Sequence, residues 1–178
     1  MTSSPSFREL LTGSRYWELL QSTGFASLIV GKDADRLRPC VLYVGTVNRC
    51  NFDCAFCPVS KTTRPRNVMP MDMFERVVRQ YEAMGGGVFS LTPFGEFLLD
   101  PLLPDRLSVL ASRKGNLRPS LTTNLSLLGK WDDKVVEQLL FTMERLHISI
   151  YGTTEREFTE ITGRPGHIHA EVKSQLTR

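Results

Sequence analysis

The stretch Cys40-Val-Leu-Tyr-Val-Gly45-Thr-Val-Asn-Arg-Cys50-Asn-Phe-Asp-Cys54-Ala-Phe-Cys57 joins a short apolar run to three closely spaced cysteines. The run from Cys40 to Gly45 predicts a strand, so the cysteine loop (residues 50–57) follows the carboxyl end of that strand. The chain has four cysteines in 178 residues, and three of them lie in this loop. Three thiolates suit an iron-sulfur cluster or zinc, and they leave one coordination position without a ligand from the loop.

Length and composition predict a single globular domain with its own core. Hydrophobic residues make up 41% of the chain and charged residues 23%, which is ordinary for a soluble protein. The net charge of +3 gives no support for a nucleic-acid or membrane partner. Because the sequence contains neither a bilayer-spanning apolar run nor a signal peptide, we expect a cytoplasmic protein whose cysteines stay reduced.

From Cys40 onward, apolar runs alternate with amphipathic segments, as is typical of βαβ units. Further strands are predicted at residues 88–92, 120–124 and 146–151. The predicted helices are residues 71–84 with Asp72 and Glu75 as a capping pair, a helix beginning at Asp100-Pro101, and one beginning at Asp132-Asp133 with Val135, Val136, Leu139 and Leu140 on its apolar side. Thr154 and Glu157 are predicted to cap a last short helix that ends at Gly163.

This order predicts an α/β fold in which helical crossovers connect parallel strands, either as an open sheet or as part of a (β/α) barrel. Residues 1–39 are predicted to form a short helical N-terminal extension, and residues 40–178 to form the main domain. Residues 85–87, a glycine triplet, are interpreted as a helix stop.

The cysteine loop resembles that of the radical S-adenosylmethionine (SAM) enzymes, which reads C-x3-C-x-aromatic-C, with Phe56 at the aromatic position. The resemblance implies a [4Fe-4S] cluster held by Cys50, Cys54 and Cys57, with an open iron that binds SAM. Reductive cleavage of SAM then gives a 5′-deoxyadenosyl radical that abstracts hydrogen from an unidentified substrate. The resemblance favours a partial barrel of about six strand-helix units, of which this chain supplies about four, so residues 40–178 are expected to be a truncated core.

The same resemblance assigns residues to SAM. Gly95 and Glu96, after the second predicted strand, are similar to a Gly-Gly-Glu segment that meets the amino group of SAM, although Phe94 replaces the first glycine. Phenylalanine does not take a positive φ cheaply, so this replacement bears on the geometry of the turn.

Three more polar residues are implied to contact the ribose or carboxylate of SAM, namely Thr123, Asn124 and Ser149, and Phe56 is implied to lie near the adenine. The residues alone favour turn chemistry for Asn124 and a half-buried strand hydroxyl for Ser149.

Two other functions remain open. In a non-catalytic zinc or iron-sulfur electron-transfer site, the fourth ligand is Cys40 or one of the histidines His147, His167 and His169. Cys40 is otherwise interpreted as a small buried residue, His147 as structural, and the His167-Ile-His169 pair as an exposed segment. Alternatively, the chain is an inactive fragment of a longer radical SAM enzyme.

The densest basic run, Lys61-Thr-Thr-Arg64-Pro-Arg66, follows the cysteine loop. It is interpreted as a solvated loop, with contact to substrate phosphates or carboxylates as the alternative.

The resemblance implies an oxygen-sensitive enzyme that takes electrons from a reductant such as flavodoxin or ferredoxin.

Overall fold

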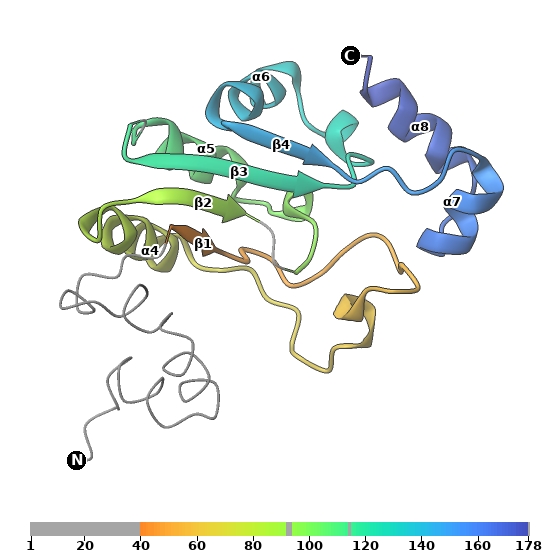
Figure 1. Cartoon of the computed structure of the whole chain (residues 1–178), viewed down its shortest axis with the longest axis horizontal. Helices are drawn as coiled ribbons and strands as arrows, with labels where there is room; N and C mark the ends of the chain where they lie inside the picture. The colour runs from red at the N-terminus through yellow and green to blue at the C-terminus, as the bar shows by residue number, and fades with distance from the viewer. Residues whose placement is uncertain (1–39, 92–93, 114, 178) are drawn as a thin grey trace, which may run out of the picture. The chain divides into compact units, whose positions relative to one another are not determined.

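The computed structural model describes residues 40–91, 94–113 and 115–177, which belong to one compact unit, Pro39–Arg178. One parallel sheet runs through this unit in the order β1-β2-β3-β4 (Figure 1). Its strands are β1 (Val41–Tyr43), β2 (Gly87–Leu91), β3 (Leu117–Thr123) and β4 (Arg145–Ile148). The predicted parallel α/β fold is therefore confirmed, whereas the predicted helical extension, residues 1–39, lies outside the described residues.

Three helices connect the strands: α4 (Met71–Ala83), α5 (Leu103–Ala111) and α6 (Asp133–Thr142). Helix α4 packs against α5, and α5 packs against α6, so the helices follow the order of the strands. One hydrophobic core joins them to the sheet, with Phe74 of α4, Leu107 of α5 and Leu121 of β3 completely buried. Each βα unit thus buries its apolar face against its neighbours.

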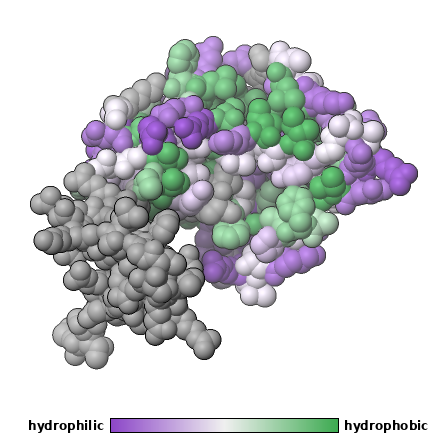
Figure 2. All heavy atoms as spheres, in the orientation of Figure 1, coloured by the Kyte–Doolittle hydropathy of each residue, from purple (hydrophilic) through white to green (hydrophobic). Residues whose placement is uncertain are grey.

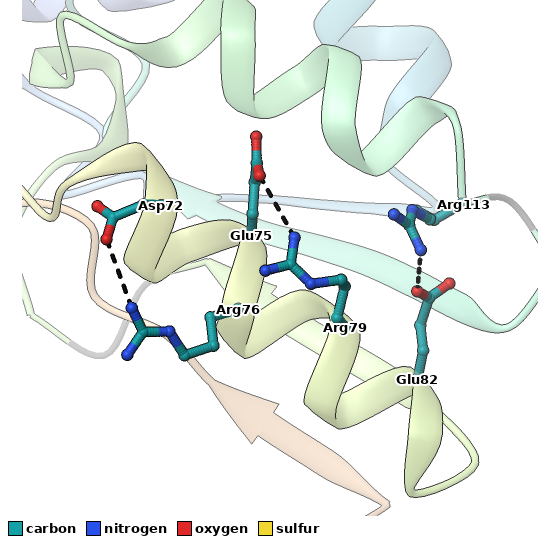
Figure 3. A network of polar contacts seen from close by, with 6 residues as sticks. All are labelled: Asp72, Glu75, Arg76, Arg79, Glu82 and Arg113. Atoms are coloured by element: carbon teal, nitrogen blue, oxygen red, sulfur yellow. Dashed lines mark hydrogen bonds and ion pairs between the residues drawn. The ribbon is translucent and has the colours of Figure 1, made fainter.

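Helix α4 begins without the predicted capping pair. Asp72 and Glu75 instead face arginines one turn further along the helix, and the distances are 3.5 Å from Asp72 to Arg76 and 3.4 Å from Glu75 to Arg79 (Figure 3). Residues spaced by four lie on one side of a helix, so these ion pairs compete with capping for the carboxylates. The glycine triplet ends α4 as predicted, because the N–H of Gly86 bonds to the carbonyl of Tyr81 at 2.9 Å.

Helix α5 begins at Leu103, three residues after the predicted cap at Asp100. Asp100 accepts the N–H of Leu102 at 2.9 Å and the Nε of Arg106 at 2.8 Å, and both charged side chains are completely buried. Arg106 also donates to the carbonyl of Met69 and lies over the ring of Phe74. Because the buried ion pair takes up the carboxylate of Asp100, the first turn of α5 forms later in the chain.

Helix α6 begins as predicted, with Asp132 accepting the N–H of Val135 at 2.9 Å. Leu140, predicted on its apolar side, is 56% exposed, and Phe141 is 76% exposed. On the face drawn in the space-filling view, apolar patches lie among polar side chains (Figure 2). Strand β4, an edge strand of the described sheet, follows α6, so this helix has less apolar surface to pack against than α5 has.

Two further helices follow the sheet, α7 (Glu155–Thr162) and α8 (His167–Gln175), and the sequence predicted only the first of them. The capping box of Thr154 and Glu157 is present, and Gly163 ends α7 with a φ of 65°. The strands point toward the side of the sheet where α7 lies (Figure 1). Among the helices of the described chain, none combines the length and apolar character that a membrane span requires.

Candidate functional site

The cysteines lie on an excursion of the chain, residues 48–67, that is closed at its base. Val47 and Val68 form an antiparallel bridge there. The side chain of Asn48 accepts the N–H of Asn67 at 2.7 Å and donates to the carbonyl of Pro65 at 2.6 Å. The excursion therefore leaves and rejoins the domain at one fixed point beyond the carboxyl end of β1.

Helix α7 holds the cysteine loop from outside. The N–H of Asp53 donates to the carbonyl of Thr162 at 3.0 Å, and the N–H of Ala55 donates to that of Ile161 at 2.9 Å. Carbonyls of the last helical turn have no partner within the helix, so the loop satisfies groups that a free helix end leaves to water.

Aromatic packing adds to this attachment. The ring of Phe52, in the loop, meets Phe158 of α7 edge to face at a centroid distance of 5.6 Å. Phe158 in turn lies 5.4 Å from the ring of His169, on α8. His169 is only 4% exposed, so the prediction of an exposed segment is wrong for this residue, because α8 turns it inward against α7.

A cleft at the carboxyl ends of the strands gathers all the predicted site residues. It encloses about 100 Å³ and is partly open, with Phe56, 68% exposed, at its rim. Its lining consists of Cys50, Phe52, Cys54, Phe56, Cys57, Val59, Ser60, Gly95, Glu96, Thr122, Thr123, Asn124, Ser149 and Tyr151. The nine predicted site residues come from the cysteine loop and from the ends of β2, β3 and β4, which is where functional residues of parallel α/β folds gather.

Glu96 is buried in this cleft, with 2% exposure, and connects two strand ends. Its Oε1 accepts the hydroxyl of Thr123 at 2.6 Å and the N–H of Leu98 at 3.1 Å, while Oε2 accepts the N–H of Asn124 at 2.9 Å. Burial raises the pKa of the Glu96 carboxyl, and these hydrogen bonds oppose the rise. Among the described residues Oε2 has only this one hydrogen-bond donor, so it can accept another.

Gly95 takes the conformation that the turn before Glu96 requires, with a φ of 109°. A Cβ at this position would lie 2.5 Å from the carbonyl oxygen of Val47 and 2.9 Å from that of Arg49. Leu125 is the one non-glycine residue with a positive φ in the described chain, so Phe94 meets no such requirement. The replacement of the first glycine by Phe94 therefore leaves the turn intact.

Asn124 joins the end of β3 to the cysteine loop. Its Nδ2 donates to the Oδ1 of Asn51 at 3.0 Å and lies 3.8 Å from the Sγ of Cys50. The hydroxyl of Ser126 donates to Asn124 at 2.7 Å and accepts from Asn51 at 2.8 Å. The sequence analysis did not predict Asn51 or Ser126 as site residues. The only available signal was the position of Asn51 directly after Cys50.

The aromatic side of the cleft includes a residue that the sequence analysis did not assign to the site. Tyr151 lies 5.9 Å from the ring of Phe56 and 6.2 Å from that of Phe52. Ser149, predicted inside the fourth strand, follows its last residue and donates its N–H to the carbonyl of Thr123 at 2.9 Å. An aromatic residue just beyond a strand's carboxyl end was the available signal for Tyr151.

The thiols of the cleft suit a metal-bound state. Burial and the nearby Cys50 and Cys57 raise the pKa of Cys54 to about 11, and burial raises that of Cys50. No lysine or arginine of the described residues lines the cleft to offset three thiolates. Metal ions deprotonate coordinating thiols outright, so the donor set fits an iron-sulfur cluster.

The residues proposed for a closed site lie elsewhere. Cys40 is exposed, contrary to prediction, because it precedes an edge strand, and its carbonyl accepts the N–H of Val88 at the amino end of β2. His147 on β4 and His167 on α8 are also exposed. None of these residues lines the cleft, and within the described ranges no three Cys, His, Asp or Glu side chains form a single-ion site. In a cubane each thiolate binds a different iron, so the thiols need not share one point.

Solved structures share this fold. BtrN in complex with AdoMet and 2-DOIA has a TM-score of 0.54 and 20% identity over 63% of this chain and 46% of that chain. SuiB of Streptococcus suis bound to precursor peptide SuiA has a TM-score of 0.63 and 19% identity, over 97% and 37%. HydG, a maturase of the [FeFe]-hydrogenase, has a TM-score of 0.56 and 13% identity, over 95% and 39%.

At these identities the likeness shows the fold, which confirms the predicted partial (β/α) barrel of the radical SAM type. The chain spans between 37% and 46% of the lengths of these three structures. No curated protein matches its sequence.

The sequence profile described as Radical SAM superfamily matches residues 44–177. This match contains every residue that lines the cleft. Members of the superfamily are enzymes that typically use a [4Fe-4S] cluster and SAM. A profile match of this extent, on a fold of the same type, shows that the chain belongs to the radical SAM superfamily.

Proposed function

We propose that this chain holds a [4Fe-4S] cluster at Cys50, Cys54 and Cys57 and cleaves SAM reductively, so that a 5′-deoxyadenosyl radical abstracts hydrogen from a substrate. The observation that carries the proposal is the convergence of all nine predicted residues on one cleft. If the three cysteines had no common function, there would be no reason for Glu96, Asn124 and Ser149 to line the same cleft.

The side chains of the cleft have different roles, which follow from their chemistry. The free side of Glu96 Oε2 accepts from an ammonium group, and the amide of Asn124 fixes the loop beside Cys50. Phe56 and Tyr151 offer ring faces to the adenine, which stacks on aromatic surfaces. When bound, the cluster supplies the electron that breaks the bond between the sulfonium and the 5′ carbon.

Cluster uptake tests the ligand assignment. The full chain is reconstituted anaerobically with iron and sulfide, and bound iron is counted in the wild type and in single cysteine variants. We expect Cys50→Ala, Cys54→Ala and Cys57→Ala each to lose the cluster, and Cys40→Ala to retain it as the matched control. Cluster loss in Cys40→Ala would instead support a closed four-ligand site.

Turnover is a separate question because the chain spans less than half the length of the compared structures. We also propose a cytoplasmic location and a reductant such as flavodoxin or ferredoxin, and the substrate is unidentified. Formation of 5′-deoxyadenosine from SAM under dithionite tests cleavage without a natural reductant or substrate. If the chain is loaded with a cluster but forms no 5′-deoxyadenosine, the result would support the alternative that it is an inactive fragment of a longer enzyme.

A further inference from the structure

A second cavity adjoins the cleft along the cysteine loop. It has a volume of about 290 Å³ and is called the arginine pocket below. Its lining consists of Asn48, Arg49, Cys50, Asn51, Phe52, Asp53, Val59, Ser60, Arg66 and Arg164. Four of these residues, Cys50, Phe52, Val59 and Ser60, also line the cleft, so the two cavities share a wall.

The two cavities differ in charge. Among the described residues, the charged or ionisable lining of the cleft includes thiols and Glu96 but no lysine or arginine, whereas the arginine pocket brings Arg49, Arg66 and Arg164 together with one acid, Asp53. Two of its three positive charges therefore have no compensating carboxylate on the pocket wall. Like charges that gather in one cavity repel each other, so an arrangement of this kind favours an anionic ligand.

Five arginines elsewhere in the described chain form ion pairs with acids, namely Arg76, Arg79, Arg106, Arg113 and Arg156. Arg113 lies 2.6 Å from Glu82, and Arg76 and Arg79 lie beside acids on α4 (Figure 3). In the arginine pocket, by contrast with those five, no ion pair joins Arg49, Arg66 or Arg164 to a carboxylate of the described residues. Its guanidinium groups are thus left available for a ligand.

Several donors on the wall of the arginine pocket already have hydrogen-bond partners within the chain. The amide side chains of Asn48 and Asn51 are occupied by bonds to Pro65 and Ser126, and Arg49 gives one N–H to the carbonyl of Leu99 at 3.3 Å.

Arg164 differs from these residues. Its Nε is buried and has no hydrogen-bond partner among the described residues. A buried donor without a partner costs roughly 1–3 kcal/mol, which a bound acceptor would recover.

We propose that the arginine pocket binds the phosphate or carboxylate group of a small molecule. Guanidinium groups match both anions by paired N–H donors, and three of them from separate segments surround one space. The volume of about 290 Å³ admits a small molecule or one terminal group. This site goes beyond the proposed function and does not rest on it, because it needs neither the cluster nor SAM.

Binding of two probe anions tests the site. The full chain, with its thiols reduced, is titrated with inorganic phosphate and separately with malonate at constant ionic strength, and binding is followed by nuclear magnetic resonance. We expect saturable binding of at least one anion at one site, weakened about tenfold or more in Arg66→Gln and in Arg164→Gln. Saturation by phosphate alone or malonate alone identifies which of the two groups the pocket takes.

Arg156→Gln is the control, because it removes the same charge from a side chain that is 87% exposed on α7 and does not line the pocket. We expect its affinity to match the wild type. Circular dichroism of each variant confirms folding, and Arg66, on an exposed part of the excursion, serves where Arg164→Gln does not fold. Absence of saturable binding for both anions, or an equal loss in Arg156→Gln, would overturn the proposal.

Discussion

Oε2 of Glu96 accepts the backbone N–H of Asn124 at 2.9 Å, and this bond ties the segment after β2 to the end of β3. The side chain that the family resemblance assigns to SAM therefore also organises the cleft. Its second oxygen holds Thr123, so the carboxylate joins two of the predicted ligand-contacting residues directly. A change at Glu96 should affect stability as well as SAM binding.

Glu96→Gln tests this double role. In either orientation of the new amide, an NH₂ group faces a buried donor, so we expect the free energy of unfolding to fall by roughly 1–3 kcal/mol. Urea unfolding followed by circular dichroism measures the change. Glu137→Gln, on the exposed surface of α6, is the matched control and should stay within about 0.5 kcal/mol of the wild type. Equal stabilities for the two variants would remove the structural role of Glu96.

Gly95→Ala tests the close approach of two loops. The new Cβ would meet the Val47 carbonyl at 2.5 Å, and the backbone has a φ of 109°. We expect lower stability and reduced cluster uptake, because residues 47–49 must shift. Gly115→Ala has a similar φ of 117° with nothing within 4 Å of the added Cβ, so it carries the backbone strain alone. Comparable thermal midpoints for the two variants would contradict the clash.

Phe158→Ala tests the support that α7 gives to the cysteine loop. Phe158 is 1% exposed and packs on Phe52, so we expect a loss of about 3–5 kcal/mol in unfolding free energy and weaker cluster uptake. Phe158→Leu keeps most of the apolar volume and should lose less. Phe141→Ala removes a ring that is 76% exposed and should leave both properties unchanged. Full cluster uptake by a folded Phe158→Ala protein would argue against this support.

Thiol alkylation tests the cysteine environments in the chain without a cluster. Cys54 is 7% exposed, and its pKa is raised to about 11, so little thiolate is present near pH 8. Its reaction with iodoacetamide should be slow there and should accelerate as the pH rises toward 11. The exposed Cys40 should react first, and cluster loading should protect the three loop cysteines but leave Cys40 reactive. Mass spectrometry after digestion assigns each modified residue.

Local signals predicted the elements well. Hydrophobic periodicity, the capping box of Thr154 and Glu157 and the glycine triplet each depend on neighbours in the sequence, and the structure contains the corresponding elements. The order of strands and helices placed the predicted residues on one edge of the sheet, because parallel strands all end there. The parallel α/β fold was predictable for this reason.

Long-range contacts were not predictable from such signals. The sequence predicted Asp100 as a helix cap, because its buried ion pair with Arg106 forms only in the packed structure. It predicted a buried Cys40, because the sequence does not show that β1 is an edge strand. The attachment of the cysteine loop to α7 depends on backbone carbonyls at the end of that helix, which carry no sequence signature. The arginine pocket likewise combines residues from three separate segments.

Electron paramagnetic resonance of the anaerobically reconstituted and reduced chain, recorded with and without SAM, tests whether SAM binds at a cluster in the cleft. We expect a [4Fe-4S] signal that shifts when SAM is added, and we expect this shift to be lost in a folded, cluster-loaded Glu96→Gln variant. Loading of the cluster is checked independently by iron and sulfide content. A fully loaded, reduced cluster whose signal is identical with and without SAM would contradict the assignment of the cleft to SAM.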